Sequence, residues 1–223
     1  LRWVAESAEG QALTGVRRRF LDETLADFRE SGAELPDLGK RRLEALEGEL
    51  ASITQTFSEN VLDAMNQVEL LIDDPARLDG LPESARAAAL ALARAKGLGT
   101  PTQPVWRFTL HMPSYLPVMK FSADEPLRRT LWEAMGAVGG VAPHDNTPLI
   151  GQILRLRHEK ATLLGAAHFP DHILNRRMAR RGEVALGFIN RLHERVKGAF
   201  DADVAELAAF KAELLNQPGV ALE

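Results

Sequence analysis

Residues 43–72, LEALEGELASITQTFSENVLDAMNQVELLI, carry the strongest periodic pattern in the sequence. Their apolar residues recur every three or four positions, at Leu43, Leu46, Leu50, Ile53, Phe57, Val61, Met65, Val68 and Ile72. This spacing places them on one face of an α-helix. With Pro36-Asp37 as a start signal and Asp73-Asp74-Pro75 as a stop signal, the pattern predicts a helix of about 35 residues, ~50 Å long. Such a helix must pack antiparallel to other long helices.

Helical periodicity is also present on both sides of this stretch. It recurs in segments with caps or breakers at their ends, at residues 16–30, 85–95, 124–135, 147–164, 170–178 and 183–215. Asp124 is the expected N-cap of its helix, and Gly97 follows the alanine-rich helix where a left-handed cap belongs. The sequence therefore predicts about seven helices.

One segment has a different period. Trp106, Phe108, Leu110 and Met112 alternate with other residues, as in a β-strand with one apolar face. The two prolines in 113–117 are expected to turn the chain, so that 118–121 returns as a partner strand. The predicted fold class is thus mainly α, an antiparallel long-helix bundle with one small β-hairpin near residues 105–121.

The composition is that of a globular protein, and it excludes several classes of function. The 223 residues are 45% hydrophobic and 26% charged, with a net charge of −4. This balance gives no general attraction to nucleic acid or to an anionic membrane surface. The longest run without Asp, Glu, Lys or Arg, residues 108–119, is too short for a membrane-spanning helix and contains two prolines. The absence of cysteine excludes disulfides and sulfur-ligated metal, and it fits a cytoplasmic location.

Two helical positions begin a zinc-peptidase motif without completing it. That motif needs histidines at i and i+4, so that both imidazoles reach one metal, with a glutamate at i+1. His158-Glu159 is followed by Thr162 at i+4, and His193-Glu194 is followed by Lys197. Neither pair can bind zinc in this way, and both are expected to be solvated or capping side chains.

The other histidines are weaker candidates for metal ligands. His168 and His172 have the i, i+4 spacing, but Pro170 between them favours the first turn of a helix and leaves His168 outside it. His111 and His144 are expected on the surface or in turns. No metal ligand and no catalytic residue is therefore assigned, and substrate-binding residues stay unknown.

Motifs for other chemistries are also incomplete. No Gly-x-Ser-x-Gly nucleophile elbow occurs, Gly39-Lys40 lacks the rest of a P-loop, and Gly97-Leu98-Gly99 lacks the third glycine of a dinucleotide fingerprint. The cationic cluster of Arg176, Arg177, Arg180 and Arg181 has two interpretations, a solvated basic patch or a surface for an anionic partner.

Several blocks of sequence, taken in order, indicate a family. They are residues 57–64, 80–84, 112–119, Leu127-Arg128 with Trp132 and Ala134, Asp145-Asn146, 153–161 with Leu163-Leu164-Gly165, and Met178-Ala179. Over roughly residues 16–215 the chain resembles the oligopeptidase A and thimet oligopeptidase family of zinc metallopeptidases. It departs from the family at Val138, Gly139 and Gly140, where relatives carry an arginine near the end of the helix.

The resemblance implies a mostly helical protein with a narrow channel that admits short peptides. It also implies a zinc ion on a His-Glu-x-x-His helix, in a segment C-terminal to the region that matches here. No zinc ligand or general base of the family has a counterpart in these residues. Residues 1–215 are therefore expected to form a wall of the substrate channel, with 216–223 as a truncated tail.

We thus expect a piece of a zinc oligopeptidase that is inactive by itself. Its partners would be the missing C-terminal catalytic half and, in the parent protein, short peptides; exposed apolar helix faces would also favour self-association. The alternative is a stand-alone, non-catalytic helical module that binds peptide or protein. A third possibility is an enzyme with an unfamiliar site of histidines and carboxylates.

Overall fold

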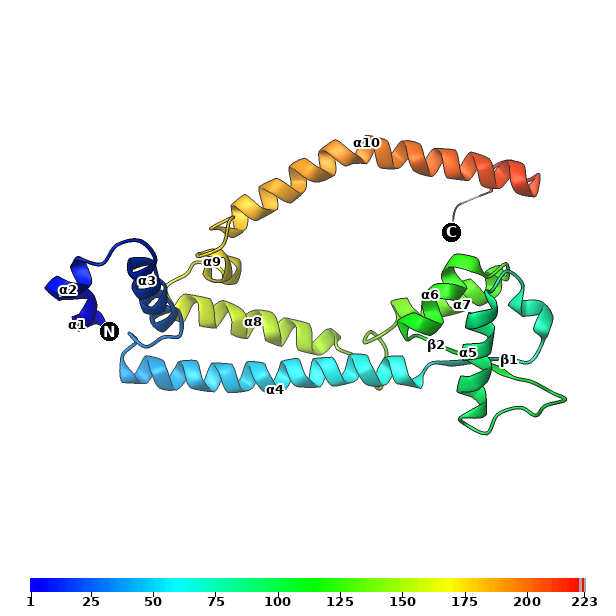
Figure 1. Cartoon of the computed structure of the whole chain (residues 1–223), viewed down its shortest axis with the longest axis horizontal. Coiled ribbons are helices and arrows are strands. Elements are labelled where there is room, and N and C mark those ends of the chain that lie inside the picture. The colour runs from blue at the N-terminus through cyan, green and yellow to red at the C-terminus, as the bar shows by residue number, and fades with distance from the viewer. Residues whose placement is uncertain (221, 223) are drawn as a thin grey trace. The chain divides into compact units, whose positions relative to one another are not determined.

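The computed structural model describes residues 1–220 and 222, and within them the protein is mainly helical (Figure 1). The elements in chain order are α1 (Arg2–Glu6), α2 (Ala8–Gln11), α3 (Gly15–Glu30), α4 (Asp37–Gln67), β1 (Glu69–Ile72), the 3-10 helix η1 (Pro75–Leu78), α5 (Glu83–Arg94), β2 (Trp106–Thr109), α6 (Met112–Phe121), α7 (Glu125–Gly136), α8 (Thr147–Leu163), α9 (Phe169–Leu174) and α10 (Gly182–Leu215). The predicted fold class, mainly α with one small antiparallel sheet, is confirmed. The expected tail, 216–223, includes Ala221 and Glu223, which lie outside the described residues.

The chain divides into two compact units. The first unit comprises Leu1–Leu43 and Arg157–Glu223, and the second comprises Glu44–Leu156. The divisions fall inside α4 and α8, so both of these long helices contribute residues to each unit.

The second unit is built around the two-stranded sheet, which α5 and α6 cover (Figure 1). Its core consists of apolar residues from the sheet, η1 and helices α5 to α7: Ile72, Leu78, Leu81, Ala89, Phe108, Leu110, Val118, Leu127 and Leu131. The α7 helix begins at the predicted cap, because the Asp124 carboxylate accepts a hydrogen bond from the Leu127 backbone N–H at 2.9 Å. Gly97 takes the predicted left-handed conformation, with φ +72°.

The long helix α4 ends earlier than its apolar pattern predicts. It stops at Gln67, and residues 69–72 form β1 instead of a last helical turn. This strand pairs antiparallel with β2, with Leu70 opposite Phe108 and Ile72 opposite Trp106. Pairing satisfies the backbone groups of β1 that face β2, while Ile72 is 1% exposed in the core. The prediction of a last helical turn at residues 69–72 is therefore wrong, because pairing with β2 and burial in the core outweigh the local helical periodicity.

The predicted hairpin within residues 105–121 is also wrong in its second half. The strand at Trp106–Thr109 is present, but Met112–Phe121 is helix α6 and not a turn with a return strand. Pro113 lies in the first turn, where a missing N–H breaks no helical bond, and the turn is tied to β2 by the Thr109 N–H, which donates to Ser114 Oγ at 3.0 Å. The helix brings Val118 into the core, fully buried.

A buried amide links α4 to the loop before α8 within the second unit. Asn146 is 2% exposed, and its side-chain oxygen accepts a hydrogen bond from Asn60 Nδ2 at 2.8 Å. Its own Nδ2 donates to the Phe57 carbonyl at 3.0 Å, and its backbone N–H donates to the Gly139 carbonyl at 2.8 Å. The residue thus satisfies its polar groups while fixing the loop.

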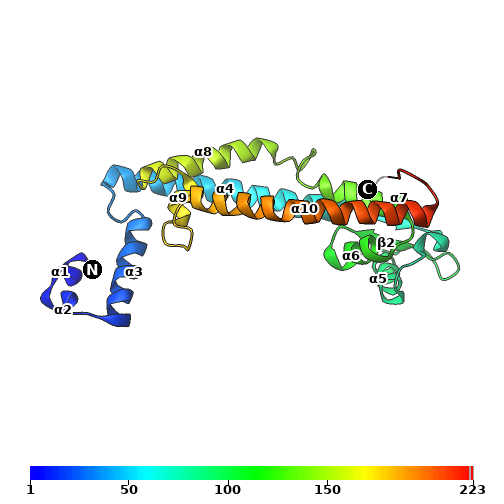
Figure 2. The ribbon, with the colours of Figure 1, turned by 90° about the horizontal axis from the view of Figure 1, so that it is seen from above.

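The first unit contains the long C-terminal helix α10, which Figure 2 shows as one continuous helix. Each of its 34 residues is exposed or half-buried. Its large apolar side chains are spaced as on one broad face and include Phe188, Leu192, Val196, Phe200, Leu207, Phe210 and Leu214. Among the described residues, all of the helices are too short or too polar to cross a membrane.

Candidate functional site

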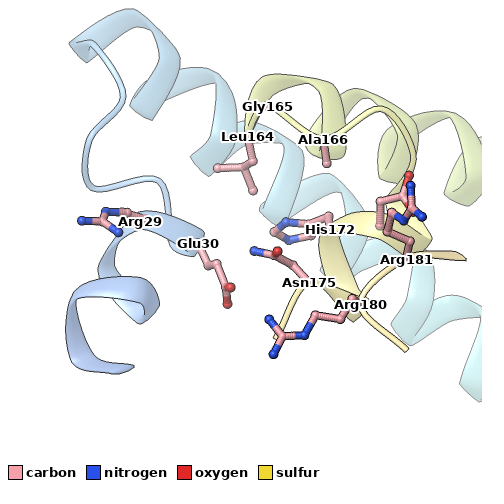
Figure 3. Close-up of a pocket in the computed structure, with 10 residues that line it drawn as sticks. Arg29, Glu30, Leu164, Gly165, Ala166, His172, Asn175, Arg180 and Arg181 are labelled. Atoms are coloured by element: carbon pink, nitrogen blue, oxygen red, sulfur yellow. The ribbon is translucent and has the colours of Figure 1, made fainter. Parts of the chain in front are cut away.

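A pocket of about 390 Å³ lies in the first unit, and its walls carry both charges (Figure 3). It is formed by the end of α3, the turn after α8, α9, and the segment between α9 and α10. The lining residues are Arg29, Glu30, Leu164, Gly165, Ala166, Asp171, His172, Asn175, Arg180 and Arg181. This combination of guanidinium, carboxylate, imidazole and amide groups makes the pocket the candidate site.

Arg176 fastens one wall of the pocket to the other. Its guanidinium pairs with Glu23 and Asp27 of α3 and reaches the Oε2 atom of Glu30 at 3.3 Å. These three carboxylates lie on one face of α3 because they are spaced by four and three residues. They also hold the pKa of Arg176 above its usual value, chiefly through the hydrogen bonds to Asp27 and Glu23. The segment after α9 is thereby held against α3.

The chain enters α10 through a tightly packed turn. The Asp171 carboxylate accepts a hydrogen bond from the Gly182 backbone N–H at 2.8 Å, and a side chain at Gly182 would meet Pro170 Cβ at 2.9 Å. Just before this contact, Arg180 has a φ of +64°, in the left-handed region that side chains other than glycine seldom adopt. The position of Arg180 is thus imposed by the anchored turn.

Figure 3 shows the side chains of Glu30, His172, Asn175 and Arg180 pointing into a common space. Glu30 comes from α3, whereas the other three come from α9 and the segment that follows it. Within residues 1–220 and 222, the Arg180 guanidinium forms no ion pair or side-chain hydrogen bond, with Glu30 or with any other group. Two opposite charges therefore face one space without neutralising each other.

Arg29 and Asp171, two other charged residues of the pocket lining, are already engaged. Arg29 approaches Glu34 at 3.4 Å, and Glu34 also accepts from Arg2 at 2.5 Å. Burial lowers the pKa of His172, and the nearby Lys160 lowers it further, while Glu30 acts in the opposite direction. A lowered pKa favours the neutral imidazole near pH 7, so His172 offers a donor and an acceptor and adds no charge.

The incomplete zinc motifs lie apart from this pocket lining. Glu159 on α8 is held by Arg42, whose Nε and Nη2 atoms donate to its two oxygens at 2.6 and 2.8 Å. His193 lies in α10, and His168 is the N-cap residue of α9, outside the helix that contains His172, as predicted. In the described part of the chain, no three side chains of His, Cys, Asp or Glu gather as a metal site.

The two remaining candidate histidines contact side chains at the C-terminal end of α4. The His111 ring nitrogen Nε2 is 3.0 Å from Asn66 Oδ1, and that of His144 is 2.6 Å from Gln67 Nε2. His111 is also the N-cap residue of α6. His111 is exposed and His144 lies in a turn before α8, which agrees with the expectation that they are surface or turn residues.

The sequence pointed to part of the pocket only. The sequence shows the cluster of arginines, but its members have different roles. Arg176 forms ion pairs with α3, whereas Arg180 faces the pocket. Glu30 and Asn175 were missed. The signal that could have found Glu30 is the spacing of three acidic residues, Glu23, Asp27 and Glu30. This spacing places them on one face of a helix, where a basic segment can bind.

Comparison with known proteins relates the chain to peptidases. The family described as Peptidase family M3 matches residues 118–222. Oligopeptidase A of Salmonella typhimurium is 36% identical over 207 residues, which cover 90% of this chain and 30% of that protein. The probable cytosolic oligopeptidase A of Arabidopsis thaliana is 33% identical over 217 residues, covering 96% of this chain and 30% of that protein.

The chain belongs to the oligopeptidase A and thimet oligopeptidase family. Within the family, the dipeptidyl carboxypeptidase of Escherichia coli is 30% identical over 217 residues, with 97% of this chain and 31% of that protein covered. The chain thus spans about 30% of the length of the oligopeptidase A relatives that it matches.

Proposed function

We propose that this chain is part of a zinc-dependent oligopeptidase that hydrolyses short peptides. In this proposal, residues 1–215 form a helical wall of the substrate channel, and residues elsewhere in a longer protein hold the zinc ion and supply its Lewis-acid chemistry. The observation that carries the proposal is the pattern of coverage: relatives named oligopeptidase A match 90% or more of this chain, yet the match is only 30% of their length.

The arrangement of side chains supports a wall in preference to a catalytic centre. The incomplete motifs at His158 and His193 lack a second histidine, and the described residues gather no metal-binding group. A channel wall acts by excluding bulky substrates and by orienting the peptide, which lowers the entropic part of the barrier. The chain by itself is then expected to be catalytically inactive, and the parent protein to be cytoplasmic.

The exposed face of α10 supports the same proposal. A row of large apolar side chains on a helix of 34 residues is typical of a face that packs against further protein. In the proposal, this face is covered by the catalytic half of the peptidase, and by a second copy of the chain when that half is missing.

The alternative is a stand-alone module that binds peptides without cleaving them. The pocket in the first unit favours this candidate, since its carboxylate and guanidinium groups are complementary to the charged ends of a peptide. The described residues of its lining contain no group that is placed to bind a metal and no nucleophile assigned from the sequence.

The coding sequence downstream of codon 223 separates the two functions. An open reading frame that continues into a His-Glu-x-x-His segment is the expected result, and the full product should then cleave short peptides in a chelator-sensitive manner. A stop codon directly after Glu223 would contradict the peptidase proposal and leave the binding module.

A further inference from the structure

We propose that the pocket between α3 and the α9–α10 segment binds a zwitterionic ligand the size of an amino acid or a dipeptide. Glu30 receives the ammonium group of this ligand, and Arg180 with Asn175 receives its carboxylate. The inference concerns a binding site in the first unit, and it goes beyond the proposed peptidase function without depending on it.

The main argument is that two opposite charges face one space without pairing with each other. Glu30 and Arg180 point into one space (Figure 3), but in the described part of the chain they form no ion pair with each other, and Glu30 is paired with Arg176 instead. Opposite charges that face one small space attract each other and would meet if their backbones allowed it. A ligand that carries both charges can satisfy both groups at once.

The local contacts of each residue explain why the two side chains stay apart. Glu30 is held on α3 through its Oε2 atom, 3.3 Å from Arg176. Arg180 is held by its left-handed backbone, between the Arg176 clamp and the bond from the Gly182 N–H to Asp171. Holding ligand-binding groups in place before binding reduces the entropy lost on binding.

The remaining hydrogen-bonding capacity suits the two ends of the ligand. The second oxygen of Glu30 is available for an ammonium group, because a carboxylate accepts about four hydrogen bonds and Arg176 uses one. Arg180 offers its five guanidinium N–H donors, in a planar arrangement that matches a carboxylate. The Asn175 amide, which points into the same space, adds a further donor.

The size and the apolar lining of the pocket limit the ligand. Its volume of about 390 Å³ is at the small end of ligand pockets, which begin near ~300 Å³. An extended dipeptide spans at most ~7 Å. Leu164 and Ala166 in the turn after α8 can contact a small apolar side chain. These limits favour a neutral dipeptide such as alanyl-leucine as the probe.

The test is a titration of the 223-residue chain with alanyl-leucine, N-acetyl-alanyl-leucine and alanyl-leucine amide, followed by NMR. The free dipeptide should bind at least tenfold more tightly than either blocked form, because each blocked form lacks one charge. This comparison needs no variant of the protein, so a folding defect cannot confuse it.

Two variants assign the ends of the ligand. Arg180→Gln should abolish the preference for the dipeptide over its amide, while its preference over the N-acetyl form remains. Glu30→Gln should abolish the preference for the dipeptide over its N-acetyl form, while its preference over the amide remains. Arg195→Gln, which removes an exposed arginine of α10 outside the pocket lining, should keep both preferences.

Three results would overturn the proposal: no saturable binding of the free dipeptide, equal binding of the blocked forms, or the same loss in Arg195→Gln as in Arg180→Gln. The downstream reading frame does not enter this experiment, so a failure here leaves the peptidase proposal standing.

Discussion

Helices α7 and α10 differ sharply in how they use their apolar residues. The 12-residue α7 has Leu127 and Leu131 fully buried in the core of the second unit. The 34-residue α10 leaves Phe200 65% exposed, and its other residues are also exposed or half-buried. The short elements of the second unit complete one another's packing, whereas the first unit does not supply enough surface to cover α10. Apolar periodicity predicts that a helix forms, but it does not identify the partner.

The largest expected effect tests this contrast in stability. Phe108→Ala empties a site in the second unit that is 1% exposed, and it should lower the unfolding free energy by about 3–5 kcal/mol. Phe200→Ala in α10 should change it by less than ~0.5 kcal/mol. Denaturant unfolding followed by far-UV circular dichroism, which reports on both units, measures the two values. Similar losses of unfolding free energy in the two variants would contradict the contrast between the buried and the exposed site.

The second prediction concerns the exposed face of α10 itself. The chain should self-associate as its concentration rises, because large exposed apolar patches tend to become covered by another chain. Phe200→Glu combined with Leu207→Glu should shift the light-scattering mass towards the monomer. Ala209→Glu places a charge on the opposite face of the helix and should leave the association unchanged. A wild-type chain that stays monomeric at high concentration would count against this account of α10.

A smaller effect is expected from the buried amide of the second unit. Asn146→Ala removes the partner of Asn60 Nδ2 and of the Phe57 carbonyl, and it should cost about 1–3 kcal/mol. Asn190→Ala, at an exposed position of α10, should have little effect. The same unfolding experiment compares them, and an equal response would show that burial does not set the difference.

The smallest effect is a pH dependence near the sheet. The pKa of Glu69 is lowered by hydrogen bonds from Lys96 and from Arg107, the latter at 2.8 Å. A carboxyl group with a lowered folded-state pKa stabilises the fold above its unfolded pKa, ~4.3, and this contribution is lost as the pH falls through the folded-state value. Glu69→Gln should therefore reduce the acid-side loss of stability. Glu133→Gln is the control, and identical profiles for wild type and Glu69→Gln would refute the prediction.

The sequence predicted those parts of the fold that depend on local signals. The cap at Asp124, the left-handed Gly97 and the start of α10 near Glu183 follow from neighbouring residues, and the structure confirms them. The change from α4 to β1 could not be predicted in this way. Val68 and Ile72 continue the helical spacing, and only the pairing of 69–72 with β2 shows that they belong to the sheet unit.

The same distinction applies to α6 and to the pocket. Two prolines within 112–121 favour a turn locally, and α6 forms because its packing buries Val118. The α-helices of the described residues that the sequence did not predict, α1, α2 and α6, are all 10 residues or shorter. In the pocket, the arginine cluster is visible in the sequence, but the pairing of Arg176 with α3 joins residues about 150 positions apart, which no local pattern encodes.

Peptide cleavage by the isolated 223-residue chain tests the central claim most directly. A purified, metal-analysed sample is incubated with a set of short peptides, with and without added zinc and with a chelator. We predict no bound zinc and no cleavage above background, because the described residues do not gather a metal-binding group. Robust, chelator-sensitive turnover that co-purifies with the chain would contradict the account of it as a non-catalytic wall.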